Sequence, residues 1–312
     1  METNTERIFN FLDGHAERIS KNEGTLYLEA VLETVRAWAD GKTSPEVEKA
    51  SKEEVRKGLQ LAMLKGMKES AQPNHQMTPD SIGLIAGYLA DRLSGGKPYV
   101  TLFDPAIGTG NLLFTVMNFM DGRTAASGSE IDDLLIQLAA ASADLLSQPV
   151  TLYHQDSLRP LMVDPADFVI TDLPVGYYPD DENAMNYNLR AEEGHSYAHH
   201  LFIEQSMRHL KKGGHGIFVA PANLFESEFA TQLHTFLKDE AEILGVIALP
   251  EGLFKNRANA KSLLLLRKPE ARTGPKPEVL LAQAPDLKNA NAVSAFFGKV
   301  DAWAEQNGYR KA

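Results

Sequence analysis

The chain has 312 residues, 43% of them hydrophobic, which is enough for one large or two modest domains with real cores. It contains no cysteine, and this excludes disulfides, thiolate catalysis and thiolate metal sites. The formal net charge of −11 argues against a chain that grips nucleic acid unaided, because contacts to phosphate supply most of the non-specific affinity.

The start of the chain and its apolar runs bear on its location. The polar beginning METNTERIF does not read as a signal peptide. No apolar run approaches the roughly 20 residues needed to cross a membrane. We therefore expect a cytoplasmic protein without a membrane partner.

Residues 1–73 are predicted to form an N-terminal helical domain. Apolar residues recur at helical spacing with charges between them, and Gly24 and the turn at 41–45 separate three helices. This domain is either a helical cap on the next domain or a module that docks a partner. A second domain, 74–312, is expected to open with a helix that Thr78 caps, with Pro79 in its first turn, and that runs to about Leu93.

The stretch 99–112 is the centre of the second domain. Residues 99–103 are apolar and predict a buried parallel strand, Asp104 lies at its carboxyl end, and a helix begins near Asn111. Ligands bind beyond such strand ends, and Gly108 and Gly110 let the backbone approach a bound group, although a tight turn needs glycine for steric reasons too. Neither a dinucleotide fingerprint nor a phosphate loop is present, and the acid suits an ammonium or sulfonium ligand.

Two further strands are each expected to end in an acid. A short strand after residue 125 ends at Glu130, about 20 residues past the glycine loop, where a nucleotide site places a carboxylate that accepts the ribose hydroxyls. A surface position for Glu130 is the alternative. After a helix over 133–147, the strand that begins at Val150 leads to Asp156. The ends of these strands would place Asp104, Glu130 and Asp156 along one rim.

The remaining segments complete the predicted sheet. Strands are expected at 167–172, 215–221, 243–250 and 262–267. Helices are expected at 197–211 and 226–240, and Gly213-Gly214 would end the first of them. A linker over 269–277 leads to a short strand at 278–282 and a closing helix at 291–306. The sequence thus predicts an α/β fold with a Rossmann-like seven-stranded sheet and helices on both faces. The N-terminal helical domain precedes this sheet in the chain.

Asp104-Pro-Ala-Ile-Gly-Thr-Gly110 resembles motif I of the amino-methyltransferases that use S-adenosylmethionine. The specific resemblance is to the N6-adenine DNA methyltransferases, above all the modification subunit of type I restriction systems, and it runs from about Thr78 to Arg267 in motif order. It implies S-adenosyl-L-methionine as cofactor. The implied cofactor-binding residues are Thr78, Asp104, Ala106, Gly108, Gly110, Asn111, Leu112, Glu130, Ile131, Asp156, Ser157 and Leu158.

The same resemblance places the catalytic motif at Asp172-Leu-Pro-Val175. In the family, the acid or amide and a backbone carbonyl accept hydrogen bonds from the target amino group, and an aromatic residue stacks on the extruded base. Asp172 and Pro174 are kept. Leu173 replaces the first proline, and Val175 stands where the aromatic belongs, so Tyr177 or Tyr178 would have to supply the ring. The predicted catalytic residues are Asp172, Pro174 and Tyr177.

Charge and length bear on partners. The acids from Asp180 to Glu193 would repel phosphate, and residues 269–312 are too few for a domain that recognises a DNA target. A separate DNA-recognition partner is therefore implied, with weak DNA binding by this chain alone and an open oligomeric state. The basic residues in the last third are expected on a solvated surface, with a nucleic-acid edge as the alternative; they are Lys255, Arg257, Lys261, Arg267, Lys268, Arg272 and Lys276.

The histidines at 195, 199 and 200 are not expected to bind a metal, because no acidic or thiolate ligand has matching spacing. The leading hypothesis is transfer of a methyl group from S-adenosylmethionine to an amino nitrogen, above all adenine N6 of DNA. One alternative is a degenerate member that binds the cofactor as a regulatory module without turnover. Another is methylation of a small molecule or a protein.

Overall fold

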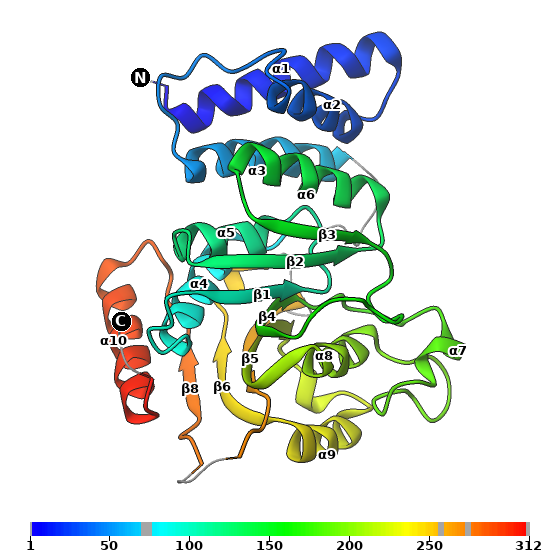
Figure 1. Cartoon of the computed structure of the whole chain (residues 1–312), viewed down its shortest axis with the longest axis vertical. Helices are drawn as coiled ribbons and strands as arrows, with labels where there is room; N and C mark the ends of the chain where they lie inside the picture. Colours follow the sequence, from blue (N-terminus) through cyan, green and yellow to red (C-terminus); the bar gives the residue numbers. More distant parts are fainter. Residues whose placement is uncertain (1, 70–76, 255–258, 272–275, 310–312) are drawn as a thin grey trace.

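The computed structural model describes residues 2–69, 77–254, 259–271 and 276–309 (Figure 1). In these residues a single sheet carries helices on both faces, and the helices of the N-terminal region are stacked beyond it. No helix in the described ranges is both long and apolar enough to span a membrane. The predicted α/β fold is confirmed.

The sheet has eight strands in the order β3-β2-β1-β4-β5-β7-β6-β8. Strand β7 runs antiparallel to both neighbours, and the other pairs are parallel. The seven strands predicted for the sheet are present, and the short strand predicted at 278–282 joins the same sheet as β8 beside β6, so the sheet has eight strands and not seven. The strands are β1 (Val100–Asp104), β2 (Thr124–Glu130), β3 (Val150–His154), β4 (Ala166–Asp172), β5 (Leu210–Pro221), β6 (Glu242–Ala248), β7 (Lys261–Arg267) and β8 (Leu280–Gln283).

Helices bury both faces of the sheet. Successive side chains of a strand point to opposite faces, so Leu102 and Phe103 of β1 enter different hydrophobic clusters and are 1% and 0% exposed. One face packs against α4 (Asp80–Leu93), α5 (Asn111–Phe119), α6 (Asp133–Leu146) and α10 (Ala290–Gln306). The other face packs against α8 (Ala198–Arg208) and α9 (Ala230–Glu240), near the short α7 (Asp181–Ala184). The core therefore consists of two layers that the sheet separates.

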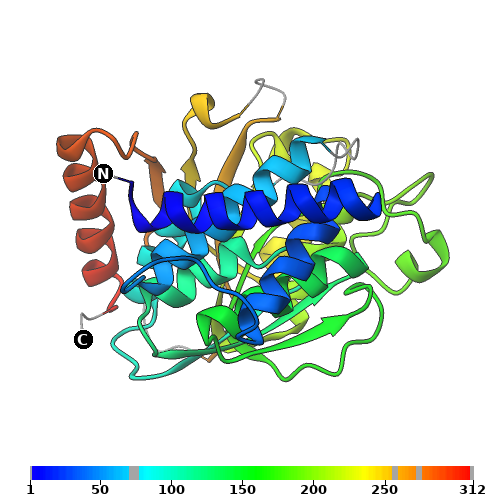
Figure 2. The same cartoon turned by 90° about the horizontal axis from the view of Figure 1, so that it is seen from above.

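The N-terminal region forms α1 (Asn4–Glu23), α2 (Tyr27–Ala39) and α3 (Lys52–Glu69), as predicted. These helices share a third cluster with Leu138 and Ala141 of α6, so they pack on the sheet domain through its outer helix. Figure 2, seen from above, shows α1 lying across the top of the molecule. The predicted division at residues 73 and 74 lies outside the described residues and stays a prediction.

Two predicted helix ends are wrong. Pro79, not Thr78, occupies the N-cap of α4, because the Thr78 hydroxyl is directed to Asp172 and caps no backbone N–H. The helix predicted to reach residue 211 ends at Arg208, because the chain enters β5 at Leu210, which pairs with Ala166 of β4. Sheet pairing overrides the helical pattern there, and the two glycines at 213 and 214 lie inside the strand.

Candidate functional site

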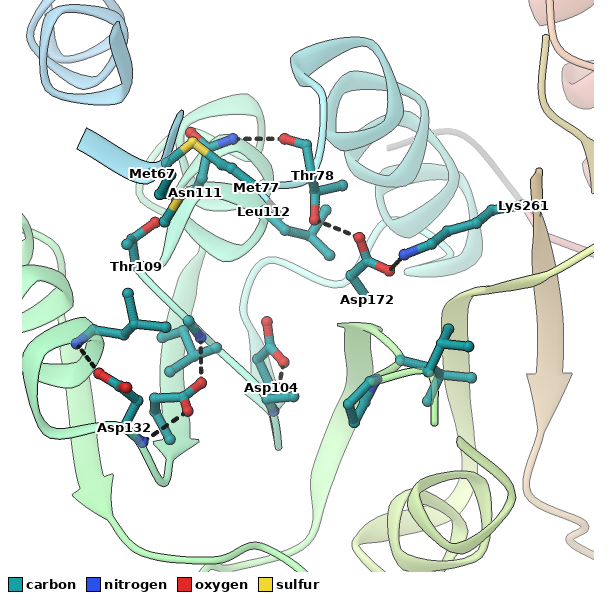
Figure 3. Close-up of a pocket in the computed structure, with 18 of the residues that line it drawn as sticks. Met67, Met77, Thr78, Asp104, Thr109, Asn111, Leu112, Asp132, Asp172 and Lys261 are labelled. Atoms are coloured by element: carbon teal, nitrogen blue, oxygen red, sulfur yellow. Dashed lines mark hydrogen bonds and ion pairs between the residues drawn. The ribbon is translucent and has the colours of Figure 1, made fainter. Parts of the chain in front are cut away.

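A cavity of about 860 Å³ opens beyond the carboxyl ends of β1, β2 and β4 (Figure 3). Its walls come from the loops after these strands, from the segment before α4, from α3 and from the start of β7. Ten of the residues predicted from the sequence line it: Thr78, Asp104, Ala106, Gly108, Asn111, Leu112, Glu130, Ile131, Asp172 and Pro174. Of the three acids predicted along one rim, Asp104 and Glu130 therefore lie at this cavity together with Asp172.

The two glycines of the central loop have different reasons to be glycine. Both have a positive φ, 56° for Gly108 and 83° for Gly110. A Cβ on Gly110 would lie 2.3 Å from the Phe114 ring, so sterics within the protein account for that residue. A Cβ on Gly108 would meet no heavy atom within 4 Å, and Gly108 lines the cavity. The open space over Gly108 fits the approach of a bound group.

Asp104 is 1% exposed at the end of β1. Its Oδ1 accepts a hydrogen bond of 3.0 Å from the backbone N–H of Ala106. Burial raises the pKa of Asp104 to about 7, and the nearby charges of Glu130 and Asp172 act in the same direction. A cationic ligand in the cavity would favour the ionised form of this carboxyl group.

Glu130 is held by the backbone at the end of β2. Its Oε2 accepts from the N–H of Gly108 at 2.9 Å, and its Oε1 accepts from Ile131 and Asp132 at 2.9 and 3.0 Å. A carboxylate offers about four acceptor positions, so one remains beside these three. Ile131 next to it is 66% exposed and supplies an apolar surface at the cavity.

Asp156, Ser157 and Leu158 are not among the described residues that line the cavity. The Asp156 carboxylate accepts a hydrogen bond of 2.5 Å from the Tyr178 hydroxyl and one of 2.9 Å from the Leu158 N–H. The Ser157 hydroxyl donates to the Pro105 carbonyl, and the Leu158 side chain is buried. In this arrangement Asp156 stabilises the loop after β3 through these hydrogen bonds, and its predicted contact with the cofactor stays a prediction.

Asp172 lies at the end of β4 with both carboxylate oxygens bonded to side chains (Figure 3). The Thr78 hydroxyl donates to Oδ2 at 2.8 Å, and the Lys261 Nζ donates to Oδ1 at 2.5 Å. The side chains of Asp172 and Lys261 are each 18% exposed. The acid expected to hold the acceptor nitrogen is thus part of a mostly buried ion pair.

The prediction of a solvated basic surface is wrong for Lys261. It lines the cavity as the first residue of β7, and Arg267 at the other end of this strand is also buried, beside Glu242 and Glu270. Lys255, Arg257 and Arg272 lie outside the described residues. The sequence carries no signal for the Lys261–Asp172 contact, because it joins residues 89 apart through the pairing of β7 with β5.

The segment after Asp172 places no aromatic ring among the described residues of the cavity wall. Leu173 is 1% and Val175 56% exposed, and both line the cavity. Tyr177 is 60% exposed and stacks on Tyr197, with ring centroids 5.2 Å apart. Tyr178 is buried and donates to Asp156. Neither tyrosine lines the cavity in this arrangement, and the predicted catalytic role of Tyr177 stays a prediction.

The geometry fits a nucleoside-bearing cation. The cavity offers two carboxylates at adjacent strand ends, an open glycine surface and the apolar side chains of Ile131 and Leu112. Asp172 lies in the same cavity, so a group bound there and an amine at Asp172 would share one space. Such a site can bring an electrophile and a nucleophile together.

The chain is similar to known proteins in both sequence and structure. The chain is 47% identical to the uncharacterized protein YtxK of Bacillus subtilis over 250 residues, which cover 80% of this chain and 76% of YtxK. A crystal structure from Listeria monocytogenes (lmo1582), provisionally described as a class I S-adenosylmethionine-dependent methyltransferase, matches with a TM-score of 0.90 and 44% identity, over 96% of this chain and 99% of that chain.

The chain also resembles a more distant methyltransferase subunit, and most of it matches a family model. The methyltransferase subunit of a type I restriction-modification system from Streptococcus thermophilus has a TM-score of 0.66 and 16% identity, covers 94% of this chain and 74% of that chain, and shares the fold. Residues 69–295 match the N-6 DNA methylase family. The chain therefore belongs to the N-6 DNA methylase family of class I methyltransferases, and its cofactor is S-adenosyl-L-methionine.

Proposed function

We propose that this methyltransferase acts on an amino nitrogen bound at Asp172, with adenine N6 in a nucleic acid as the leading acceptor. The observation that carries the proposal is the position of Asp172 in the same cavity as Asp104, Gly108 and Glu130. When bound, the cofactor supplies an electrophilic methyl group on a positively charged sulfur. Family membership supports adenine as the acceptor.

We assign the cofactor to the side of the cavity at the carboxyl ends of β1 and β2. Glu130 has one acceptor position beyond its three backbone bonds and would accept a ribose hydroxyl. Asp104, ionised, would attract the positive charges of the ligand. Thr78, Ala106, Asn111, Leu112 and Ile131 would complete the wall around it. Gly110 would contribute through the shape of the loop.

Asp172 would hold the acceptor nitrogen by accepting a hydrogen bond from one of its N–H groups, which leaves the nitrogen lone pair directed at the methyl group. The nitrogen forms its new bond as the carbon–sulfur bond breaks, and the electron pair of that bond stays on sulfur. The proton then lost from nitrogen leaves to Asp172 or to water. Because Thr78 and Lys261 already occupy both oxygens, the acceptor must use a remaining lone pair or displace Lys261.

A second candidate is methylation of an amine that is not a nucleobase, in a small molecule or a protein. The specific observation is the acceptor side of the cavity, where Val175 and Leu173 stand and Tyr177 lies against Tyr197 instead. Asp180, Asp181 and Glu182 follow shortly after in the chain and would repel a phosphate backbone. DNA, if it is the substrate, would then need a separate recognition partner.

Transfer of a labelled methyl group tests both candidates. The protein is incubated with labelled S-adenosylmethionine and DNA, RNA or fractions of a cell extract, and Asp172→Ala is run in parallel. Label in adenine of DNA or RNA that depends on Asp172 supports the leading candidate, and label in small molecules or proteins supports the second. Binding of the cofactor without transfer to any fraction would support the module without turnover.

A further inference from the structure

Arg56 of α3 is a buried cation whose side chain is 3% exposed. Its five N–H groups make five hydrogen bonds: two to Glu53, two to Asp80 and one to Asn111, at 2.6 to 3.0 Å. Burial alone would lower the pKa of Arg56, but the bonds to Glu53 and Asp80 raise it above its ordinary value. The guanidinium is therefore a fixed charge with every donor used.

Two of the partners of Arg56 begin helices at the cavity. Asp80 is the first residue of α4, and Asn111 is the first residue of α5. Gln60, also on α3, adds a hydrogen bond of 2.7 Å to Asp80. One residue of the N-terminal helical region thus fixes the starts of two helices of the sheet domain relative to each other.

The contacts continue from Arg56 to Asp172 through Thr78. The Asn111 amide accepts from Arg56 at 2.6 Å and donates to the Thr78 carbonyl at 2.9 Å. Thr78 also precedes Asp80 by two residues, so Arg56 holds it both through Asn111 and along the chain. The Thr78 hydroxyl then donates to Asp172 at 2.8 Å, and Figure 3 shows the last two of these hydrogen bonds, from Asn111 to Thr78 and from Thr78 to Asp172.

We propose that Arg56 is a positioning residue for methyl transfer, which sets the place of Asp172 through Asn111 and Thr78. This inference rests on the proposed role of Asp172 as the residue that holds the acceptor nitrogen. A misplacement of about 1 Å in such a group can cost about 100-fold in rate. The N-terminal helices are then part of the reaction site and not only a cover on the sheet domain.

Arg36 of α2 provides a matched control. Its Nη2 donates to Gln137 of α6 at 2.6 Å, so it also joins the helical region to the sheet domain. Neither Arg36 nor Gln137 lines the cavity, and no described hydrogen bond leads from this pair to Asp172. Loss of Arg36, which is exposed, removes a contact between the two regions without altering the path to Asp172, whereas a defect in positioning would follow only from loss of Arg56.

The experiment compares two cofactor analogues by calorimetry, so it needs no acceptor. Sinefungin carries an amine in place of the transferable methyl group, and S-adenosylhomocysteine carries nothing there. Their affinity ratio therefore reports how well Asp172 faces the site of transfer, and Asp172→Ala gives the ratio without that carboxylate. The variants are Arg56→Gln, Arg56→Lys, Asp80→Asn and Arg36→Gln, each checked for its melting temperature.

We expect Arg56→Gln to lower the preference for sinefungin by about tenfold, toward the value for Asp172→Ala. Arg56→Lys should recover part of the preference for sinefungin, because an ammonium group keeps the positive charge but lacks the planar set of donors of a guanidinium. Arg36→Gln should keep the wild-type ratio. If Arg56→Gln does not fold, Asp80→Asn tests the same path, because it weakens one partner of Arg56 outside the cavity.

Three results would overturn the inference. The first is a wild-type ratio in every folded variant of Arg56 and Asp80. The second is an equal loss in Arg36→Gln. In both, intact cofactor binding leaves the proposed function standing. The third is a wild type that binds neither analogue, or shows no preference that Asp172→Ala removes, and then the proposed function fails first and the inference with it.

Discussion

The two sides of the cavity are built differently. On the cofactor side, backbone N–H groups hold Asp104 and Glu130, and no ion pair of either residue occurs in the described ranges. On the acceptor side, side chains from distant segments hold Asp172, with Lys261 as a counter-ion. The first arrangement leaves negative charge for a cationic ligand, whereas the second has already neutralised its acid. Substitutions on the two sides should therefore have different effects.

The largest effect is expected for Asp172→Ala. It should abolish methyl transfer while the affinity for S-adenosylmethionine changes much less, because in the proposed function Asp172 contacts the reacting nitrogen and not the bound cofactor. Labelled-methyl transfer and calorimetry on the same preparation measure the two quantities. Equal losses in rate and in cofactor affinity would contradict the separation between the two sides.

Asp104→Asn should change how stability depends on pH. The pKa of Asp104 is about 7 in the folded protein and about 4 in an unfolded chain, so the folded protein holds the proton through this interval. The contribution of Asp104 to stability therefore falls as the pH rises from about 4 to 7, by on the order of 4 kcal/mol in total. Asn cannot ionise and removes that loss.

Melting curves of Asp104→Asn and wild type at pH 5 and pH 8 give the measurement. The variant should gain on the wild type as the pH rises. A gap between the two melting temperatures that stays constant with pH would show that Asp104 ionises normally in the folded protein.

On the acceptor side, Lys261→Met should lower the free energy of unfolding. It leaves the Asp172 carboxylate without its counter-ion at 18% exposure, and the expected loss is about 2–3 kcal/mol. The double variant Lys261→Met with Asp172→Asn should recover most of this, because no unpaired charge remains. Denaturant titration of the two single variants and the double variant measures the coupling, and additive losses would show that the two residues do not interact.

Loss of Glu130 should weaken cofactor binding by about 1–3 kcal/mol, the usual value for a hydrogen bond to a charged group. Asp133→Ala is the control, because Asp133 is an exposed acid three residues further on that does not line the cavity. Calorimetry with S-adenosylmethionine compares Glu130→Ala with this control. Equal affinities in the two variants would return Glu130 to the alternative of a surface acid.

The difference between the two sides also explains what the sequence could predict. Asp104, Gly108 and Glu130 are set by short spacings after consecutive parallel strands, and such spacings can be read from a sequence. The fold follows from the same apolar strands and helical periodicities, apart from the pairing of the short C-terminal strand with β6 and the end of α8. Lys261 and Arg56 reach the site only through tertiary packing across 89 and 55 residues, to Asp172 and Asn111, so local patterns gave no sign of them.

The smallest effect, and the one that decides between the two candidate acceptors, is expected for Val175→Tyr. Val175 lines the cavity at 56% exposure, and Tyr177 stacks on Tyr197 outside it, so the new ring would fill an open place. Stacking of a base on an aromatic side chain is worth about 1–3 kcal/mol, and we expect the lower end, since the ring must also find its orientation. The KM for an adenine-containing acceptor should then fall about fivefold, while Val175→Leu, which adds apolar bulk without a ring, should leave it nearly unchanged. A Val175→Tyr variant that instead loses transfer, with cofactor affinity intact, would indicate that the ring blocks an acceptor of another shape, and an amine outside the nucleobases would become the better reading.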